Sequence, residues 1–162
     1  MKPDQLLTKG LLEGYAGNSI ISDVERASFK GKGSHLANPD GTIYHDEWFV
    51  PTRLGAGQEL ATIGEEGMSR LYGGGQPTSE KLVELGITHQ EVDAYLIKKI
   101  SELGNRTRLY EDCSPAPDGD WQYLYEVLMR DPNIEGVALA SESILYKEVR
   151  VHWHPFIITP LK

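Results

Sequence analysis

The chain has 162 residues, of which 40% are hydrophobic, and its formal net charge is −8. This length suits a single domain over residues 1–162, and the acidic charge disfavours a nucleic-acid partner, because binding to phosphates depends on clustered Lys and Arg side chains. No apolar run reaches the length of a membrane span and the N-terminus does not have the pattern of a signal peptide, so we expect a cytoplasmic protein with no membrane partner.

The first half of the chain begins with an expected helix over residues 4–13. Asp4 is suited to cap its start, its leucines form an apolar stripe, and Gly14 can end it. We expect a strand over residues 24–30. Residues 31–40 are rich in Gly, Ser, Asn and Pro, which is typical of a loop.

The segment from Gly41 to Gly75 is the densest in β-forming aromatic residues and turn glycines. It predicts a β-meander with three strands, over residues 42–50, 58–63 and 68–72. We expect Gly55 and Gly57 to flank a turn or a bulge, and residues 73–75 to end the last strand as a flexible linker. Alternation along the first strand puts three side chains in one row: Tyr44, Asp46 and Trp48.

Two helices are expected next in the chain. One is opened by Pro77-Thr78-Ser79 and ended by Gly86. The other covers residues 89–103 and begins cleanly at Thr88, because Thr88 and Glu91 form the pattern of a capping box.

A second meander follows these helices. A short strand over residues 106–110 precedes it, and its own strands are expected over residues 120–129, 137–141 and 144–152. We expect a turn at Glu142-Ser143, and an apolar tail over residues 155–162.

These elements predict an α+β fold with antiparallel sheets, formed by two related meanders with packed helices. A shift of 79 positions aligns Tyr44 with Tyr123 and Gly57 with Gly136. An internal duplication, with pseudo-repeats over residues 1–76 and 77–162, is therefore an open interpretation.

Four short motifs mark the first half: Tyr15-Ala16-Gly17, Tyr44-x-Asp46-x-Trp48, Gly57-x-Glu59 and Leu71-Tyr72-Gly73. With these motifs the chain resembles a bacterial domain family of unknown function, whose members are free-standing or follow a helix-turn-helix domain in regulators. The resemblance covers most of residues 6–75 and implies no reaction. It also implies that no DNA-binding domain is present, since no helix-turn-helix precedes the unit. The second half departs from the pattern, because Ala138 stands where a glutamate equivalent to Glu59 is expected.

The family-like positions bring two carboxylates next to aromatic side chains. If a ligand binds, we expect it to contact five residues: Tyr15, Asp46, Trp48, Glu59 and Tyr72. A carboxylate beside aromatic walls can have its pKa raised by desolvation, and such a site suits a cationic or heteroaromatic ligand. The open alternative is that both acids only bind backbone amides at turns.

We therefore expect a binding or sensing module for a small molecule or a protein partner, with no cofactor and with a homodimer left open. The alternative is a small enzyme, a hydrolase or an isomerase, that uses Asp46 or Glu59 as its acid or base. A third interpretation is a purely protein-interaction role, which the acidic surface would favour.

His152 and His154 have the only metal-like spacing, because alternate residues of a strand project both imidazoles to one face. A third ligand such as His45 or Glu142 would be needed. Two surface histidines are the preferred interpretation, so no metal site is predicted. Cys113, the only cysteine, lies in an acidic loop that should raise the pKa of its thiol, which disfavours a nucleophile.

Overall fold

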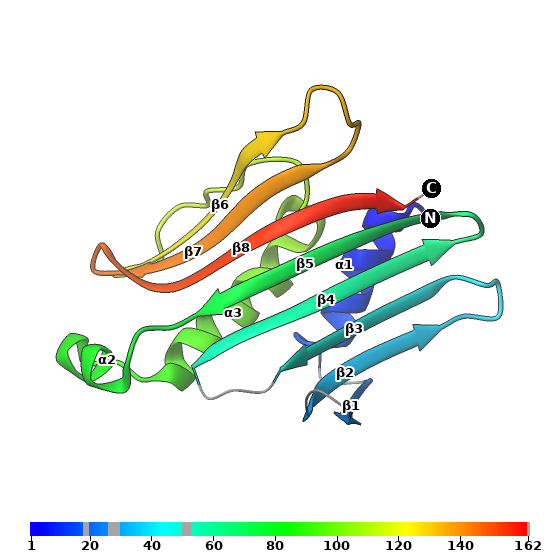
Figure 1. Cartoon of the computed structure of the whole chain (residues 1–162). Coiled ribbons are helices and arrows are strands. Elements are labelled where there is room, and N and C mark those ends of the chain that lie inside the picture. The colour runs from blue at the N-terminus through cyan, green and yellow to red at the C-terminus, as the bar shows by residue number, and fades with distance from the viewer. Residues whose placement is uncertain (18–19, 26–29, 50–52, 162) are drawn as a thin grey trace.

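The computed structural model describes residues 1–17, 20–25, 30–49 and 53–161. Within these residues, eight strands form one antiparallel sheet in the order β1-β2-β3-β4-β5-β8-β7-β6 (Figure 1). The strands are β1 (Ile21–Glu25), β2 (Lys30–Ala37), β3 (Ile43–Phe49), β4 (Leu54–Ile63), β5 (Glu66–Gly75), β6 (Trp121–Arg130), β7 (Ala138–Tyr146) and β8 (Val149–Leu161). The helices are α1 (Pro3–Glu13), α2 (Ser79–Leu85), α3 (His89–Leu103) and the short 3-10 helix η1 (Gly104–Arg106). None of the helices in these ranges is long and apolar enough to cross a membrane.

The predicted mixed α+β class is confirmed, but the two meanders form one sheet instead of separate sheets. The first meander contributes β3 to β5, which β1 and β2 extend at one edge, and the second meander contributes β6 to β8. β5 pairs antiparallel with β8 where the two meanders meet. In this pairing Tyr72 is opposite Phe156, and Arg70 is opposite Ile158. The sheet is therefore continuous across both halves of the chain.

The loop predicted over residues 31–40 is wrong, because β2 occupies most of it. Hydrogen bonding to β1 on one side and to β3 on the other overrides the weak strand preference of its Gly and Ser residues. The strand predicted over residues 24–30 is replaced by β1, which ends at Glu25. Residues 26–29 of that prediction, and residue 50 of the strand predicted over 42–50, lie outside the described residues.

The glycines of the first meander also have a different role from the one predicted. Gly55 and Gly57 lie inside β4 and do not flank a turn, and residues 73–75 are the end of β5, not a linker. Gly74 has a φ of 130°, and a Cβ there would overlap the carbonyl of Trp153 on β8. Glycine is therefore needed where these two strands come close together.

In the second half, β7 runs straight through Glu142 and Ser143, where a turn was predicted. Both side chains are buried, so the strand continues across the core. The turn lies instead at Lys147 and Glu148, which have positive φ values of 48° and 65°. The expected apolar tail after residue 155 is the second part of β8, which stays paired with β5 and β7.

The capping box predicted for α3 is confirmed. The Thr88 hydroxyl accepts a hydrogen bond from the Glu91 amide at 3.3 Å, and the Glu91 carboxylate accepts one from the Thr88 amide at 2.7 Å. The predicted cap of the first helix is wrong, because Lys2 occupies the N-cap position of α1 and Asp4 lies in its first turn. Residues 106–110 do not form the expected strand, because the chain passes from η1 into a series of bends.

Helices α1 and α3 lie on the same face of the sheet and close the core there (Figure 1). α3 contributes Leu96 and Ile100 to one buried cluster with the strands of the second half. α1 contributes Leu6 and Leu7 to another cluster, with Tyr44 of β3. Helix burial of this kind stabilises the fold through the apolar area removed from water.

Gly10 lets α1 approach the sheet closely. A Cβ at this position would overlap the aromatic ring of Tyr44, so the ring packs directly against the helix backbone. Glycine inside a helix costs about 1 kcal/mol relative to alanine, and the close packing at Gly10 offsets this cost.

The opposite face of the sheet carries exposed apolar side chains. Leu71 and Ile157 are paired in register across β5 and β8, and they are 42% and 43% exposed. None of the described helices lies over this face (Figure 1).

Candidate functional site

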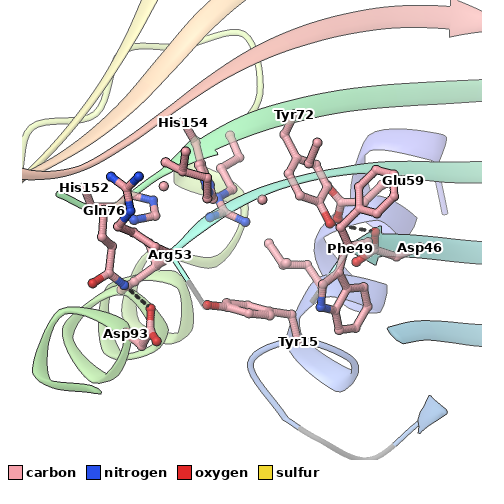
Figure 2. Close-up of a pocket in the computed structure, with 18 residues that line it drawn as sticks. Tyr15, Asp46, Phe49, Arg53, Glu59, Tyr72, Gln76, Asp93, His152 and His154 are labelled. Atoms are coloured by element: carbon pink, nitrogen blue, oxygen red, sulfur yellow. Dashed lines mark hydrogen bonds between the residues drawn. The ribbon is translucent and has the colours of Figure 1, made fainter. Parts of the chain in front are cut away.

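One cavity of about 270 Å³ lies between the helix-covered face of the sheet, α1, the segment after α1, and α3. It is lined by all five residues predicted to contact a ligand: Tyr15, Asp46, Trp48, Glu59 and Tyr72. Figure 2 shows Tyr15 across the cavity from the strands that carry Asp46, Glu59 and Tyr72. The structure therefore brings the predicted residues together at one place, between distant parts of the chain.

The strand registers explain this convergence. Alternation along β3 turns Asp46 toward the helices, and Asp46 is directly opposite Glu59 of β4. Tyr72 of β5 is opposite Gly57, and a Cβ at Gly57 would overlap the Tyr72 hydroxyl. The missing side chain of Gly57 therefore lets the Tyr72 hydroxyl reach past β4 to Asp46.

Asp46 is a deeply buried acid of the cavity. It is 2% exposed, and the Tyr72 hydroxyl donates a hydrogen bond to its Oδ1 at 3.1 Å. Burial, followed by the negative charge of Glu59, raises the pKa of Asp46 well above its usual value. The neutral carboxyl is favoured, and a neutral carboxyl can donate a hydrogen bond to a ligand.

Glu59 is held in a different way. Its carboxylate accepts two hydrogen bonds from the Arg70 guanidinium, at 2.5 and 2.8 Å, and a third from the Tyr44 hydroxyl at 3.0 Å. Arg70 also donates to the Arg108 carbonyl at 2.6 Å. Because every one of these groups is buried, Glu59 serves as the partner of a buried cation and is poorly placed to accept a proton from a ligand.

A second buried pair lies beside the first. Arg108 donates two hydrogen bonds to the Glu142 carboxylate, at 2.8 and 2.6 Å, and the Tyr123 hydroxyl donates a third at 2.5 Å. Tyr123 and Glu142 therefore repeat the contact between Tyr44 and Glu59. The prediction that the second half carries Ala138 in place of this glutamate is wrong, because the strand pairing puts Glu142 in that role.

Sequence reasoning missed both arginines. Arg70 lies two residues before Tyr72 on the same strand, so alternation alone could have put it on the cavity face. Arg108 could not have been found in this way, because it lies in an irregular segment and its own φ is 59°.

The far end of the cavity contains the two histidines of β8. His152 is 3% exposed and His154 is half-buried, and both line the cavity, so the interpretation as two surface histidines is wrong. Burial, followed by the charge of His152, lowers the pKa of His154 to about 3. His45 cannot join them, because its partly exposed ring makes a 3.1 Å ion-pair contact with Glu47, at a position of β3 that alternates with the cavity-facing Asp46.

Arg53, Gln76 and Asp93 also line the cavity, and aromatic and aliphatic side chains form much of the remaining wall. The rings of Tyr15 and Trp48 meet edge to face, with centroids 6.4 Å apart and an interplanar angle of 86°. Leu11 of α1 and Leu96 of α3 line the same space. Such a mixture of apolar walls and a few polar groups is usual in small-molecule sites.

Cys113 lies away from this cavity, and its backbone pairs with Tyr125. The pKa of its thiol is raised, as expected, but the cause is burial and not the acidic neighbours of the loop. This thiol is therefore poorly activated as a nucleophile.

Comparison of the chain with protein-family models, curated proteins and solved structures finds no match. The resemblance to a bacterial domain family of unknown function stays a prediction.

Proposed function

We propose that this chain is a binding or sensing module for a small molecule, and that the ligand occupies the cavity lined by Tyr15, Asp46, Trp48 and Tyr72. The observation that carries the proposal is the position of Asp46. A buried carboxyl with a raised pKa and one hydrogen-bond partner faces a cavity with aromatic walls. Perturbed acids of this kind are concentrated at functional sites.

The charges around the cavity favour an uncharged or weakly basic ligand. The ion pair of Glu59 with Arg70 and the ion pair of Glu142 with Arg108 are each neutral. Arg53 and Asp93, which also line the cavity, have side chains of opposite charge type, and a protonated Asp46 adds no charge. A basic ring nitrogen could accept a hydrogen bond from Asp46 or take its proton, and the resulting cation would lie near aromatic faces. A volume of about 270 Å³ suits a compact heteroaromatic molecule.

The test is a thermal-shift screen of the whole chain against flat heteroaromatic bases and their carbocyclic analogues. A ligand that binds only the folded protein at 100 times its Kd adds about 2.7 kcal/mol of stability. Heteroaromatic bases should stabilise the wild type more than the analogues do, and Asp46→Asn and Trp48→Ala should lose this effect. Leu71→Ala, on the uncovered face, is the control that should keep it.

Equal stabilisation of the wild type, Asp46→Asn and Trp48→Ala by a compound would mean that it binds elsewhere. If no compound stabilises the wild type, the small-molecule proposal fails. A protein partner or a homodimer would then use the uncovered face, where Leu71 and Ile157 are exposed side by side.

The enzyme alternative, a small hydrolase or isomerase, is supported by the raised pKa of Asp46, which suits a general acid. Glu59 is less suited to such a role because Arg70 and Tyr44 occupy its carboxylate. An enzyme would lose turnover in Asp46→Asn while still binding a substrate analogue. A binding module would show no turnover in the wild type.

The internal duplication also remains a proposal. Two equivalent hydrogen bonds support it, from Tyr44 to Glu59 and from Tyr123 to Glu142. The motifs that carry the resemblance to the family of unknown function lie in the first half of the chain.

A further inference from the structure

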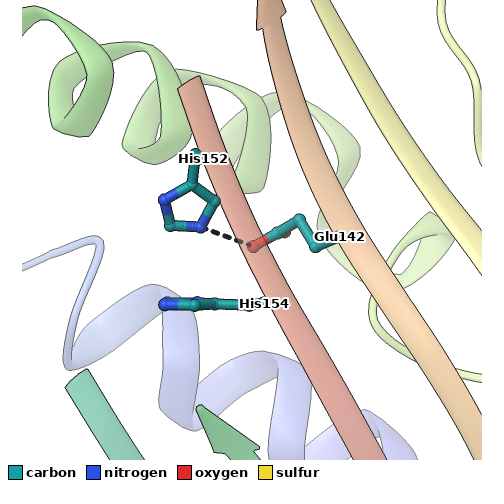
Figure 3. A group of neighbouring side chains, drawn as sticks. All are labelled: Glu142, His152 and His154. Atoms are coloured by element: carbon teal, nitrogen blue, oxygen red, sulfur yellow. Dashed lines mark ion pairs between the residues drawn. The ribbon is translucent and has the colours of Figure 1, made fainter. Parts of the chain in front are cut away.

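His152 is a buried side chain without a hydrogen-bond partner. It is 3% exposed, and neither ring nitrogen has a partner within hydrogen-bond distance among the described residues. A buried polar group without a partner destabilises the fold, so it marks a place where a bound species can compensate. Figure 3 shows the His152 ring directed toward Glu142, with the His154 ring beside it.

From this cluster we propose that Glu142, His152 and His154 bind one divalent transition-metal ion at the end of the cavity. This inference does not depend on the proposed organic ligand, because the three side chains would bind the ion themselves. The sequence offered His45 or Glu142 as a possible third ligand, predicted no metal site and placed Glu142 in a turn, whereas the structure puts Glu142 beside both histidines.

The strands position the three donors toward one point. His152 and His154 alternate along β8 and so project to the same face, and Glu142 of β7 is opposite His154 in register. The donor atoms all lie within 4.8 Å of one another. The His152 Nε2 is 3.7 Å from the Glu142 Oε2, which is longer than a hydrogen bond. Bonds from these donors to a metal ion are about 2.0–2.2 Å long. The three side chains therefore have to move toward one another by roughly 1 Å, which rotamer changes can supply.

Two imidazoles and one carboxylate suit Zn²⁺ or Fe²⁺ and not Mg²⁺ or Ca²⁺, which prefer oxygen ligands. Coordination uses the unprotonated forms of these side chains, so the affinity for the ion should fall at low pH.

Arg108 and Tyr123 orient the Glu142 carboxylate, but the charge of Arg108 also acts against a bound cation. Their hydrogen bonds fix the Glu142 carboxylate, in the manner of outer-shell partners that orient metal ligands. The positive charge of Arg108 repels a cation, and this repulsion lowers the affinity. Because Oε1 already accepts two of the three hydrogen bonds, Oε2 is the atom that would coordinate the ion.

Three protein ligands leave coordination positions open. Both histidines line the cavity, so these positions would face the space in which a small molecule fits. A ligand with a lone pair could then coordinate the ion directly.

The experiment is a titration of the whole chain with Co²⁺, followed by visible absorption, and equilibrium dialysis with Zn²⁺. The wild type should bind one ion per chain with a saturable spectral change. His154→Ala should weaken binding by at least about ten-fold. His35→Ala is the matched control, because His35 is an exposed histidine whose ring lies 5.6 Å from that of His45, and it should bind as the wild type does.

The absence of saturable binding to the wild type would overturn the proposal, and this measurement needs no variant. Loss of binding in His35→Ala with retention in His154→Ala would place the ion on the surface pair and would also overturn it. Circular dichroism checks that His154→Ala is folded, and His154→Gln replaces it if it is not. Failure of every organic ligand to bind would leave the result with Co²⁺ and Zn²⁺ unaffected.

Discussion

The hydroxyl of Tyr72 on β5 donates a hydrogen bond to the carboxyl of Asp46 on β3, across the intervening strand β4. Only a glycine at position 57 leaves room for this contact. It is the single side-chain hydrogen bond to Asp46 among the described residues, and it acts against the burial that raises the pKa of this acid.

The variant Tyr72→Phe should therefore raise the pKa of Asp46 further, because it removes a hydrogen bond that favours the ionised form. The cost in stability should be modest, about 0.5–1.5 kcal/mol. Carbon-13 NMR of the Asp46 carboxyl during a pH titration measures the change. A lower pKa of Asp46 in Tyr72→Phe would contradict the role given to this hydrogen bond.

Asp46 should also make stability depend on pH. Its folded pKa lies well above the unfolded value of 3.8, so its contribution to stability is complete below 3.8 and is lost as pH rises through the folded pKa. Asp46→Asn cannot ionise, so its free energy of unfolding should increase relative to the wild type as pH rises. Urea denaturation at a series of pH values from about pH 4 upward tests this.

Asp23→Asn is the control for that series. Asp23 is fully exposed, and its pKa is lowered by Lys32, so this variant should gain no stability relative to the wild type as pH rises. The same difference curve for both variants would rule out a specific effect of Asp46.

Glu59→Gln should destabilise the fold by about 3–5 kcal/mol, because it leaves the buried Arg70 charge without its partner. Ligand binding by this variant would therefore report on folding as much as on the site. The double variant Glu59→Leu with Arg70→Met should recover part of the loss, since no unpaired charge remains. Glu84→Gln breaks an exposed pair with Lys81 and should change stability by less than about 1 kcal/mol.

Gly10→Ala tests the packing of α1 on the sheet. Alanine favours a helix by about 1 kcal/mol over glycine, but overpacking against the Tyr44 ring costs about 1–3 kcal/mol. The variant should therefore be less stable by urea denaturation. Lys9→Ala, at a more exposed position of the same helix, should change little. A more stable Gly10→Ala would mean that the ring moves aside without loss.

The parts of the structure that the sequence predicted follow from local rules. Alternation from Tyr44 to Trp48 gave the cavity-facing row, and the pattern of Thr88 with Glu91 gave the start of α3. These features depend on neighbours a few residues away, so periodicity and capping are sufficient to find them.

The remaining features depend on contacts between distant segments. The side chain of Glu142 is buried only because Arg108 reaches it from an irregular segment, and an exposed Glu-Ser pair is otherwise typical of a turn. The glycine-rich β2 is a strand only because β1 and β3 bind its backbone on both sides. No local pattern contains this information.

The pairing of β5 with β8 has a consequence for the order of folding. Residues 67 and 161 are partners in this pairing, and β8 is synthesised after every other strand of the sheet. Until β8 arrives, the unpaired edge of β5 presents free backbone groups that can recruit other chains. Contacts of such long sequence separation slow folding, so we expect folding in milliseconds to seconds, and completion only after β8 has left the ribosome. A pulse of chaperone at this stage should raise the yield of native protein more than the same addition after β8 has paired.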